Sequence, residues 1–500
     1  MAGTTAFDWQ AFEQTLFDAW WQDAQGFLAA HPAERIYAFA LGGLYREEDG
    51  PICLPCLAAN SEAAYAEDFG GDADGNPDSL DHVRFHPADW RWPELGSDTT
   101  SARLRQAEQA LNAEATSGTV AHWRATEARL LGVLVRVCRA LAQALQSSRW
   151  QAQLTEDFIC WLSTPDDGEE ADLARQCLGD EVFARIFRGN AQQEEERRRI
   201  AALPLDDRIR YHIACLQGIP DASLGLDRAH AQSQREAAQT ALWHIGGLRA
   251  AHALLPLLDR PMQQWQAAFM LARLGVADGQ VIAALRMHVL QPAGKREHEN
   301  GRDWCAAALG ALGDSDWLLQ QLDADRAALP VQRIAHGIAH PYRAWNSRED
   351  TALIALDYGP LEAALAHRTQ AVSMLQALAS ELAPGSGYCR LRAGDVAEAV
   401  RGLHSPHVLV RMHAAAIMGE RVLGDAAAQQ LLPALAHAIT HEAELPVRRL
   451  AMYSLRDWRQ DCAPWRASIA QAAERDASEE IRGIARELLR QLPENRMTAP

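Results

Sequence analysis

The chain has 500 residues, of which 66 are acidic and 48 are lysine or arginine, so its formal net charge is −18 at pH 7. A chain of this length exceeds what one hydrophobic core supports, and we expect two or more folded units. The negative charge repels phosphate backbones and anionic lipid headgroups. We therefore expect neither a nucleic acid nor a membrane surface as the partner.

The negative charge is concentrated in the first part of the chain. Residues 1–190 contain 30 acids and 14 bases, a net charge of −16, whereas residues 191–500 contain 36 acids and 34 bases, a net charge of −2. An acidic field of this kind steers a basic partner onto the domain that carries it. The alternative is an acidic surface that serves solubility alone.

Cysteine usage and the first residues favour a cytoplasmic location. Residues 1–30 contain no lysine or arginine, so they lack the basic start of a signal peptide. No apolar stretch approaches the length needed to cross a bilayer. Nine cysteines, an odd number scattered over a long chain, are typical of free thiols in a reducing compartment rather than of a disulfide framework.

Hydrophobic spacing predicts an α+β domain over residues 1–190. Amphipathic patterns indicate helices over residues 7–30 and 120–145, and a helix that ends at residue 187. Apolar runs at residues 36–43 and 51–58 indicate a hairpin, and residues 158–162 indicate a further strand. Asn60-Ser61-Glu62 is expected to cap a short helix, and the Gly- and Asp-rich residues 70–77 are expected to form a loop.

Four short segments of this domain carry a resemblance to a known family. They are Tyr37-Ala38-Phe39-Ala40, Asn60-Ser61-Glu62, the region around Trp90, and a strand with an acidic turn that leads to Val182-Phe183-Ala184-Arg185-Ile186-Phe187. Their order resembles an uncharacterised bacterial domain family associated with polymorphic-toxin immunity loci. The resemblance covers almost all of residues 1–190 and implies a role in neutralising a partner protein.

From about residue 235 to the C-terminus one short pattern recurs eight times. The clearest copies are Val410-Arg411-Met412-His413-Ala414, Val447-Arg448-Arg449-Leu450-Ala451 and Ile481-Arg482-Gly483-Ile484-Ala485, and weaker copies place the small residue at Ala238, Ala268, Ala306, Ala335 and Ala371. The gaps between successive small residues are 30, 38, 29, 36, 43, 37 and 34. A repeat of this length predicts a solenoid, because no copy buries its apolar face without its neighbours.

In the clear copies a polar residue stands six positions before the arginine. The pairs are Ser405 with Arg411, Glu442 with Arg448, and Asp476 with Arg482. We expect the polar residue to cap the next helix, and the arginines to form a structural ladder with the acids of the turns.

This order of an acidic turn, a Val-Arg pair and paired small residues resembles the pattern of the HEAT repeat family. The resemblance covers roughly residues 200–495 and implies an all-α superhelix of about eight helix pairs. It is specific for fold rather than for function. We therefore divide the chain into an α+β domain at residues 1–190 and a HEAT-like solenoid at residues 191–500, with residues 189–199 as the joint or a bridging helix.

Several residue pairs could suggest chemistry, and structural roles are favoured for each. Cys53 and Cys56 form a C-x-x-C in a strand-like run, away from the helix N-terminus that would stabilise a thiolate. His82 and His86 lie four residues apart near acids, but as loop residues. His336 and His340 have the spacing of metal ligands on a helix, but Pro341 ends that helix at once.

Enzymatic repeat proteins are the second alternative. Deoxyhypusine hydroxylases, a HEAT-repeat family, bind two irons through four His-Glu pairs, and this chain offers only His298-Glu299 and His441-Glu442. HEAT-like DNA glycosylases need many phosphate contacts, which the charge disfavours. Bilin-lyase-type HEAT proteins remain open by fold alone. P-loop, nucleotide-fold, nucleophile-elbow and zinc-protease signatures are missing from the sequence.

The sequence therefore predicts a cytoplasmic, non-enzymatic binding protein without metal or cofactor, an immunity protein that occludes a basic toxin or effector. The alternative is a general adaptor or scaffold. The residues expected to meet the partner are acids of two loops: Asp72, Asp74, Asp166, Asp167, Glu169 and Glu170.

Overall fold

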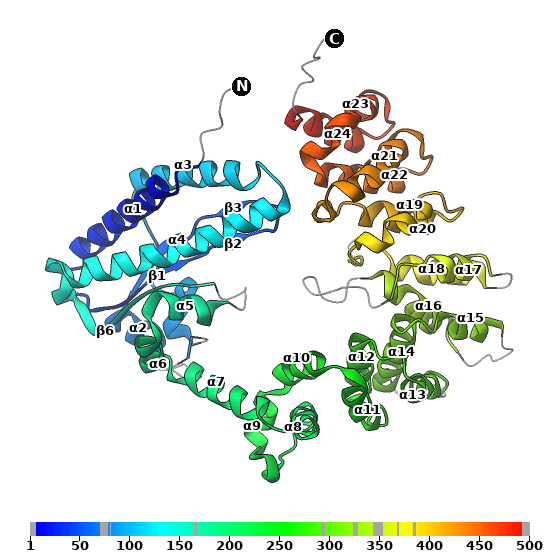
Figure 1. Ribbon diagram of the computed structural model, residues 1–500, viewed down its shortest axis with the longest axis horizontal. Helices are drawn as coiled ribbons and strands as arrows, with labels where there is room; N and C mark the ends of the chain where they lie inside the picture. Colours follow the sequence, from blue (N-terminus) through cyan, green and yellow to red (C-terminus); the bar gives the residue numbers. More distant parts are fainter. Residues whose placement is uncertain are drawn as a thin grey trace. The chain divides into compact units, whose positions relative to one another are not determined.

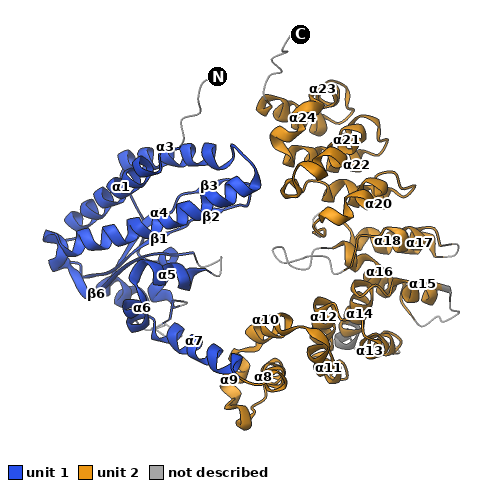
Figure 2. Cartoon of the chain, in the orientation of Figure 1, with its two compact units in different colours: residues 1–202 blue, residues 203–500 orange. Residues whose placement is uncertain are grey.

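The computed structural model describes residues 7–70, 79–80, 82–164, 169–291, 296–323, 329–343, 354–367, 370–383 and 387–492. The chain divides into two compact units, residues 1–202 and residues 203–500, which are described separately (Figure 2). Over the described part of the chain, every helix is too short or too polar to cross a membrane.

The N-terminal unit is built on a four-stranded mixed sheet. The strands, in their order across the sheet, are β5 (Trp92–Leu95), β4 (Cys56–Ser61), β1 (Ile36–Gly42) and β6 (Leu154–Leu162). β1 pairs antiparallel with β4 and parallel with β6, so the first and the last strand of the chain order lie side by side. A short ribbon of β2 (Tyr45–Arg46) and β3 (Ile52–Cys53) extends the β1–β4 connection.

Seven α-helices accompany the sheet in the described part of the N-terminal unit (Figure 1). They are α1 (Trp9–Ala30), α2 (Glu62–Phe69), α3 (Asp98–Ala115), α4 (Val120–Gln146), α5 (Glu170–Leu178), α6 (Asp180–Ile186) and α7 (Arg188–Ala201). α1, α3 and α4 pack on one another, and α4 and α5 also pack on β6. Ser61 caps α2 by accepting a hydrogen bond from the Ala64 amide, as predicted from Asn60-Ser61-Glu62.

Eight helix pairs follow among the described residues of the second unit, and they stack as two layers (Figure 1). The first layer contains α8 (Leu205–Gln217), α11 (Gly247–Leu258), α13 (Gly279–Val289), α15 (Ser315–Asp323), α17 (Gly359–Leu365), α19 (Val396–Gly402), α21 (Asp425–His441) and α23 (Arg466–Arg475). The second layer contains α10 (Arg235–Ile245), α12 (Gln264–Leu274), α14 (Arg296–Ala311), α16 (Val331–Ala339), α18 (Ala371–Glu381), α20 (Val408–Ile417), α22 (Leu445–Asp457) and α24 (Glu479–Gln491). α9 (Arg228–Ser233) lies between α8 and α10.

The repeated small residues occupy equivalent places in this array. Each lies on a second-layer helix, and seven are fully buried: Ala238, Ala268, Ala306, Ala335, Ala414, Ala451 and Ala485. Ala371, from one of the weakest sequence copies, is the partly exposed exception. Small side chains at these positions allow neighbouring helices to approach closely, which explains why the pattern repeats.

The array has a seam between its fifth and sixth pairs. Successive second-layer helices pack extensively from α12 to α18 and again from α20 to α24, whereas α18 and α20 make slight contact. Between α18 and α19 the described chain is irregular up to the short 3-10 turn Ala393–Asp395. Side chains rather than helix packing connect the two blocks, as described below.

The predicted fold class is confirmed: an α+β domain precedes an all-α, solenoid-like region of helix pairs. Strands occur between Ile36 and Leu162, and the described residues of the second unit contain none, apart from an isolated bridge between Asp221 and Leu226. The sequence did not predict α3 or β5. The residues expected to form the joint lie in α7, which belongs to the first unit.

Candidate functional site

The acids predicted to bind a partner have different surroundings. Four lie outside the described residues: Asp72, Asp74, Asp166 and Asp167. Glu169 is exposed, with its carboxylate 3.5 Å from the Arg46 guanidinium. Glu170 is buried at the start of α5 and accepts a hydrogen bond from Ser163 Oγ at 2.7 Å. The placement of Glu170 on a docking surface is therefore corrected: this carboxylate joins α5 to the end of β6.

Exposed acids nevertheless gather around this turn. Residues 156–181 contain nine acids and one base, Arg175. Six of these acids are exposed in the structure: Glu156, Asp157, Glu169, Asp172, Asp180 and Glu181. We call these six residues the acidic surface. They lie on β6, before and within α5, and in the first turn of α6.

A pocket of about 530 Å³ opens beside Arg84 in the same unit. Its charged lining is balanced, with three arginines and three acids: Arg84, Arg185, Arg188, Glu62, Glu156 and Asp157. The Arg185 and Asp157 side chains lie 3.4 Å apart. A pocket lined by both positive and negative side chains suits a polar ligand rather than a purely apolar one.

Arg84 is held rigidly at the centre of this pocket. Its guanidinium lies 4.2 Å from the ring centre of Tyr37 and 4.9 Å from that of Tyr65, and it forms two hydrogen bonds to Glu62 at 2.6 and 3.2 Å. The Arg84 carbonyl accepts hydrogen bonds from the Tyr37 hydroxyl and from Trp90 Nε1. Burial raises the pKa of Tyr37, so its hydroxyl stays protonated and donates.

The four segments that carried the N-terminal resemblance meet at this pocket. Tyr37 comes from the first segment, Glu62 from the second, Arg84 with Trp90 from the third, and Arg185 with Ile186 from the fourth. Asn60 Nδ2 also donates to the Tyr37 hydroxyl at 3.1 Å. Residues scattered over about 150 positions thus form one site, and this pocket is the candidate site of the first unit.

The repeated arginines form the ladder that the sequence predicted. Arg411 Nε donates to Glu442 at 2.9 Å, and Arg448 Nε donates to Asp476 at 2.9 Å, so each arginine reaches the turn acid of the next repeat. All three arginines of the clear copies also donate to the backbone carbonyl six residues earlier in the chain. Those bonds are Arg411 to Ser405, Arg448 to Glu442 and Arg482 to Asp476.

The turn acids act differently from the helix caps that were expected. The Glu442 carboxylate accepts from the amide of Glu444, and the Asp476 carboxylate accepts from the amide of Ser478. α24 is capped instead by Ser478, which accepts from the Ile481 amide. The acids therefore fix the turn before each helix, since an aspartate or glutamate here bonds the amide two residues on.

Replacing Arg448 by alanine should lower the free energy of unfolding by about 2 kcal/mol. The Asp476 side chain is 4% exposed and would lose its charged partner while keeping the Ser478 amide, and the carbonyls of Glu442 and Ala443 would lose a donor. The matched control is Arg490→Ala, whose side chain is 74% exposed, with about 0.5 kcal/mol expected. Chemical denaturation followed by helical circular dichroism compares the two. Equal losses would show that the ladder does not stabilise the array.

The cysteine pair has no sign of redox chemistry. Cys53 lies in β3 and Cys56 at the start of β4, both as free thiols. Burial, with nearby Glu94, raises the pKa of Cys56 to about 11, and burial also raises the pKa of Cys53. Thiols in this state are poor nucleophiles at neutral pH.

The histidine pairs have structural partners. His82 accepts a hydrogen bond from the Arg84 amide, and His86 Nδ1 lies 3.2 Å from Asp89. His336 Nδ1 lies 3.0 Å from Glu381, and burial lowers the pKa of His340. The side chains of His298 and Glu299 lie outside the described part of the chain. Among the described side chains, no group of three or more His, Cys, Asp or Glu residues is placed to hold a metal ion.

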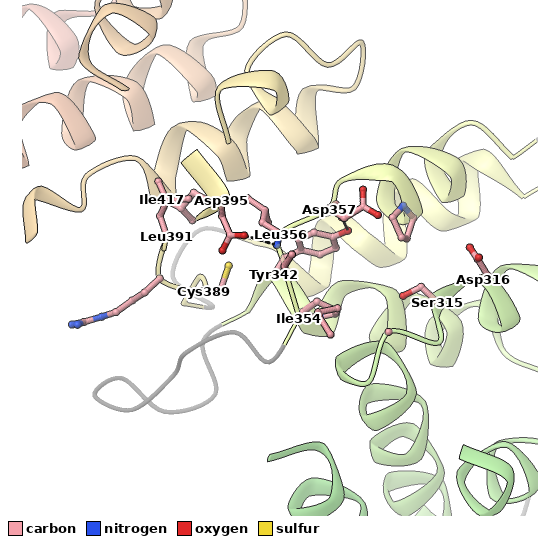
Figure 3. Close-up of a pocket in the computed structure, with 15 residues that line it drawn as sticks. Ser315, Asp316, Tyr342, Ile354, Leu356, Asp357, Cys389, Leu391, Asp395 and Ile417 are labelled. Atoms are coloured by element: carbon pink, nitrogen blue, oxygen red, sulfur yellow. Dashed lines mark hydrogen bonds between the residues drawn. The ribbon is translucent and has the colours of Figure 1, made fainter. Parts of the chain in front are cut away.

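A second pocket, of about 330 Å³, lies at the seam of the solenoid (Figure 3). Three stretches of chain line it together with Ile417 of α20: the start of α15, the described residues between α16 and the start of α17, and the segment that precedes α19. The labelled side chains include Tyr342 and Leu356 from one stretch and Cys389 and Asp395 from another. Asp395 Oδ1 accepts from the Leu356 amide at 3.0 Å, which ties two of the stretches together.

A buried hydrogen-bond network supports the wall of this seam pocket. The Tyr358 hydroxyl lies 2.8 Å from His413 Nδ1, and His413 Nε2 lies 2.8 Å from the Tyr342 carbonyl. A carbonyl only accepts, so Nε2 carries the proton and Nδ1 accepts from Tyr358. Burial lowers the pKa of His413 to about 4, which keeps the ring neutral and preserves this arrangement. The network joins α20 to the segment before α17 across the seam.

The sequence-based candidates did not include Arg84, Tyr358 or His413. Arg84 had no local signal, because its partners come from distant segments. His413 had one: it occupies the repeat position at which Leu450 and Ile484 stand in the next copies. An ionisable residue at an apolar repeat position signals a buried polar network.

Comparison with known proteins gives a family match and similarities to solved structures. Residues 17–179 match a family model described as "Domain of unknown function (DUF4303)". Human deoxyhypusine hydroxylase, solved in complex with glycerol, is 19% identical in sequence with a TM-score of 0.23, and the match covers 57% of this chain and 96% of that chain. No curated protein matches the chain. The family match spans most of the candidate pocket of the first unit.

Proposed function

We propose that this chain is a non-enzymatic, cytoplasmic immunity protein that neutralises a basic toxin or effector by binding and occluding it. The observation that carries the proposal is the net charge of −16 on residues 1–190 beside a nearly neutral solenoid. An acidic domain of this kind accelerates encounter with a basic partner. The six exposed residues of the acidic surface supply a local concentration of that charge.

The second unit supports the same proposal through its architecture. We propose that its helix pairs are HEAT repeats, and that the solenoid wraps the partner after the acidic unit has docked it. Solenoids offer long surfaces for macromolecules. The arginines of the ladder bond to turn acids and carbonyls of the array itself, so those cations serve the fold rather than an anionic ligand.

A general adaptor is the alternative, favoured by the solenoid architecture taken alone. Two observations distinguish the candidates. An immunity protein is encoded beside its toxin, and it protects only up to equal molar amounts. Protection by a substoichiometric amount would contradict occlusion and require catalysis by this chain.

Charge reversal of the acidic surface should slow association with the basic partner. In the triple variant Asp172→Lys, Asp180→Lys and Glu181→Lys, we expect the association rate at low salt to fall about tenfold, because electrostatic steering acts mainly on that rate. Stopped-flow mixing with the toxin encoded in the same locus measures it.

The control reverses three exposed acids in helix first turns of the solenoid: Glu236, Asp425 and Glu480. Both triple variants make the net charge more positive by the same amount, and both lose the favourable interaction of acids with helix N-termini. Equal slowing by the two variants would place the steering field over the whole chain and contradict docking at the acidic surface.

A further inference from the structure

The seam pocket has a volume within the range of small-ligand sites and no role in the acidic docking proposed above. Its 330 Å³ lie between two blocks of the solenoid, where the repeat is interrupted. The pocket therefore exists because the two blocks meet through side chains and short turns rather than through direct helix packing.

The inner lining of the pocket is largely apolar. Ile354, Leu356, Leu391 and Ile417 line it together with Tyr342 (Figure 3). Such a lining favours the aliphatic part of a ligand, since apolar surface is removed from water on binding.

Carboxylates dominate the charged groups of the pocket. Asp316 and Asp357 are exposed, and Asp395 is 6% exposed. The Asp395 carboxylate is buried and accepts from the Leu356 amide and from Arg392 Nε at 2.7 Å. Asp316 and Asp357 are the exposed acids of the lining, and Asp357 accepts one bond, from the Gly359 amide. Among the described residues of the lining, Arg390, also exposed, is the one basic residue.

We propose that the seam pocket takes the side chain of an arginine of the basic partner. The aliphatic stem would lie on the apolar lining, and the guanidinium would pair with Asp316 and Asp357. A guanidinium suits this site because it bonds carboxylates in a planar fork and is more weakly hydrated than an ammonium group. The assignment of a partner rests on the proposed function, whereas the chemistry of the pocket does not.

The pocket is organised before any ligand binds. The Tyr342 and Tyr358 rings stack at 5.7 Å, His413 bonds to both residues, and Arg392 Nη2 donates to the Ile354 carbonyl. Walls that are already ordered lose little conformational entropy on binding. A single buried arginine can then contribute much of the energy of a protein interface.

The first test is titration of the full chain with N-acetyl-arginine methylamide, followed by calorimetry. The comparison ligand is N-acetyl-norleucine methylamide, which has an aliphatic chain and no charge. We expect the arginine compound to bind about tenfold more tightly, from two charge pairs at a partly exposed site. Equal binding of the two compounds, or binding of neither, would overturn the proposal.

The second test removes the charges without changing side-chain size. In the double variant Asp316→Asn and Asp357→Asn, the affinity for the arginine compound should fall about tenfold. The asparagine at position 357 can still accept the hydrogen bond that Asp357 accepts from the Gly359 amide. The control Asp425→Asn removes another exposed acid from a helix first turn and should leave the affinity unchanged. An equal loss in the control would reduce the effect to overall charge and overturn the site.

The partner half of the proposal needs a third measurement. The toxin should bind the Asp316→Asn and Asp357→Asn variant about tenfold more weakly than it binds the original chain. Equal affinity would overturn the anchoring role of the pocket and leave the proposed function intact. If the toxin does not bind the original chain at all, the proposed function fails together with this partner assignment, and the compound titration alone then decides the pocket.

Discussion

Replacing Gly310 by alanine should destabilise the solenoid by about 4 kcal/mol. Gly310 lies in α14, where that helix crosses α16. A Cβ at this position would overlap the carbonyl oxygen of Gly337, and a Cβ at Gly337 would in turn meet the Ala306 carbonyl at 2.7 Å. Both neighbours are helix backbone, which cannot rotate away as a side chain can.

Gly483→Ala is the matched control, because it makes the same change inside another second-layer helix. Its added Cβ would have no atom within 4 Å, and α24 would gain helix propensity. We expect this variant to be more stable by about 0.5–1 kcal/mol. Denaturant unfolding, monitored by helical circular dichroism, should therefore shift in opposite directions for the two variants. Shifts in the same direction would contradict the close approach of α14 and α16.

The repeat architecture was predictable because its physical cause is local and recurs. A small residue is needed wherever two second-layer helices approach, and seven of the eight assigned positions are fully buried. The seam also had a sequence signal. The longest gap between small residues runs from Ala371 to Ala414, which is 414 − 371 = 43 residues, and the interruption of packing between α18 and α20 falls within it.

The sheet and the pockets depend on pairings that no local pattern encodes. β1 pairs with β6 although more than a hundred residues separate them, and the hairpin signal predicted only the β1–β4 pairing. α3 is mostly polar, with a few buried residues such as Leu111, so its apolar face was too narrow to detect. Glu170 looked like part of an acidic turn, because no local pattern indicates that it bonds to Ser163, which directly follows β6.

His413 is an ionisable residue at a repeat position that is apolar in the next copies, and this difference was the sequence signal of a buried polar network. Substitution of His413 by leucine, the residue at the equivalent place in the next copy, should cost about 3 kcal/mol at pH 7.5. The change introduces an apolar side chain of similar size but leaves the Tyr358 hydroxyl without its buried partner and removes one of the two donors to the Tyr342 carbonyl, which keeps the Cys389 amide. The matched control is the reverse change, Leu450→His, at a partly exposed position, where we expect about 1 kcal/mol.

The same residue should make the stability of the seam depend on pH. Burial lowers the pKa of His413 to about 4 in the folded chain, whereas an unfolded histidine titrates near pH 6.5. Between these values the unfolded chain binds more protons, so this stabilising contribution is complete above about pH 6.5 and declines as the pH falls toward 4. The decline is about 1.4 kcal/mol per pH unit for a single group.

Other buried histidines add their own pH dependence, so the comparison that isolates His413 is the difference in stability between the original chain and His413→Leu. Unfolding measured from pH 7.5 to 4.5 should show the two stabilities converging on the acid side. Parallel curves would mean that the pKa of His413 is the same in the folded and the unfolded chain, which would contradict a neutral ring held by burial. Divergence on the acid side would mean that the folded chain holds the ring protonated, and Nδ1 could then not accept from Tyr358.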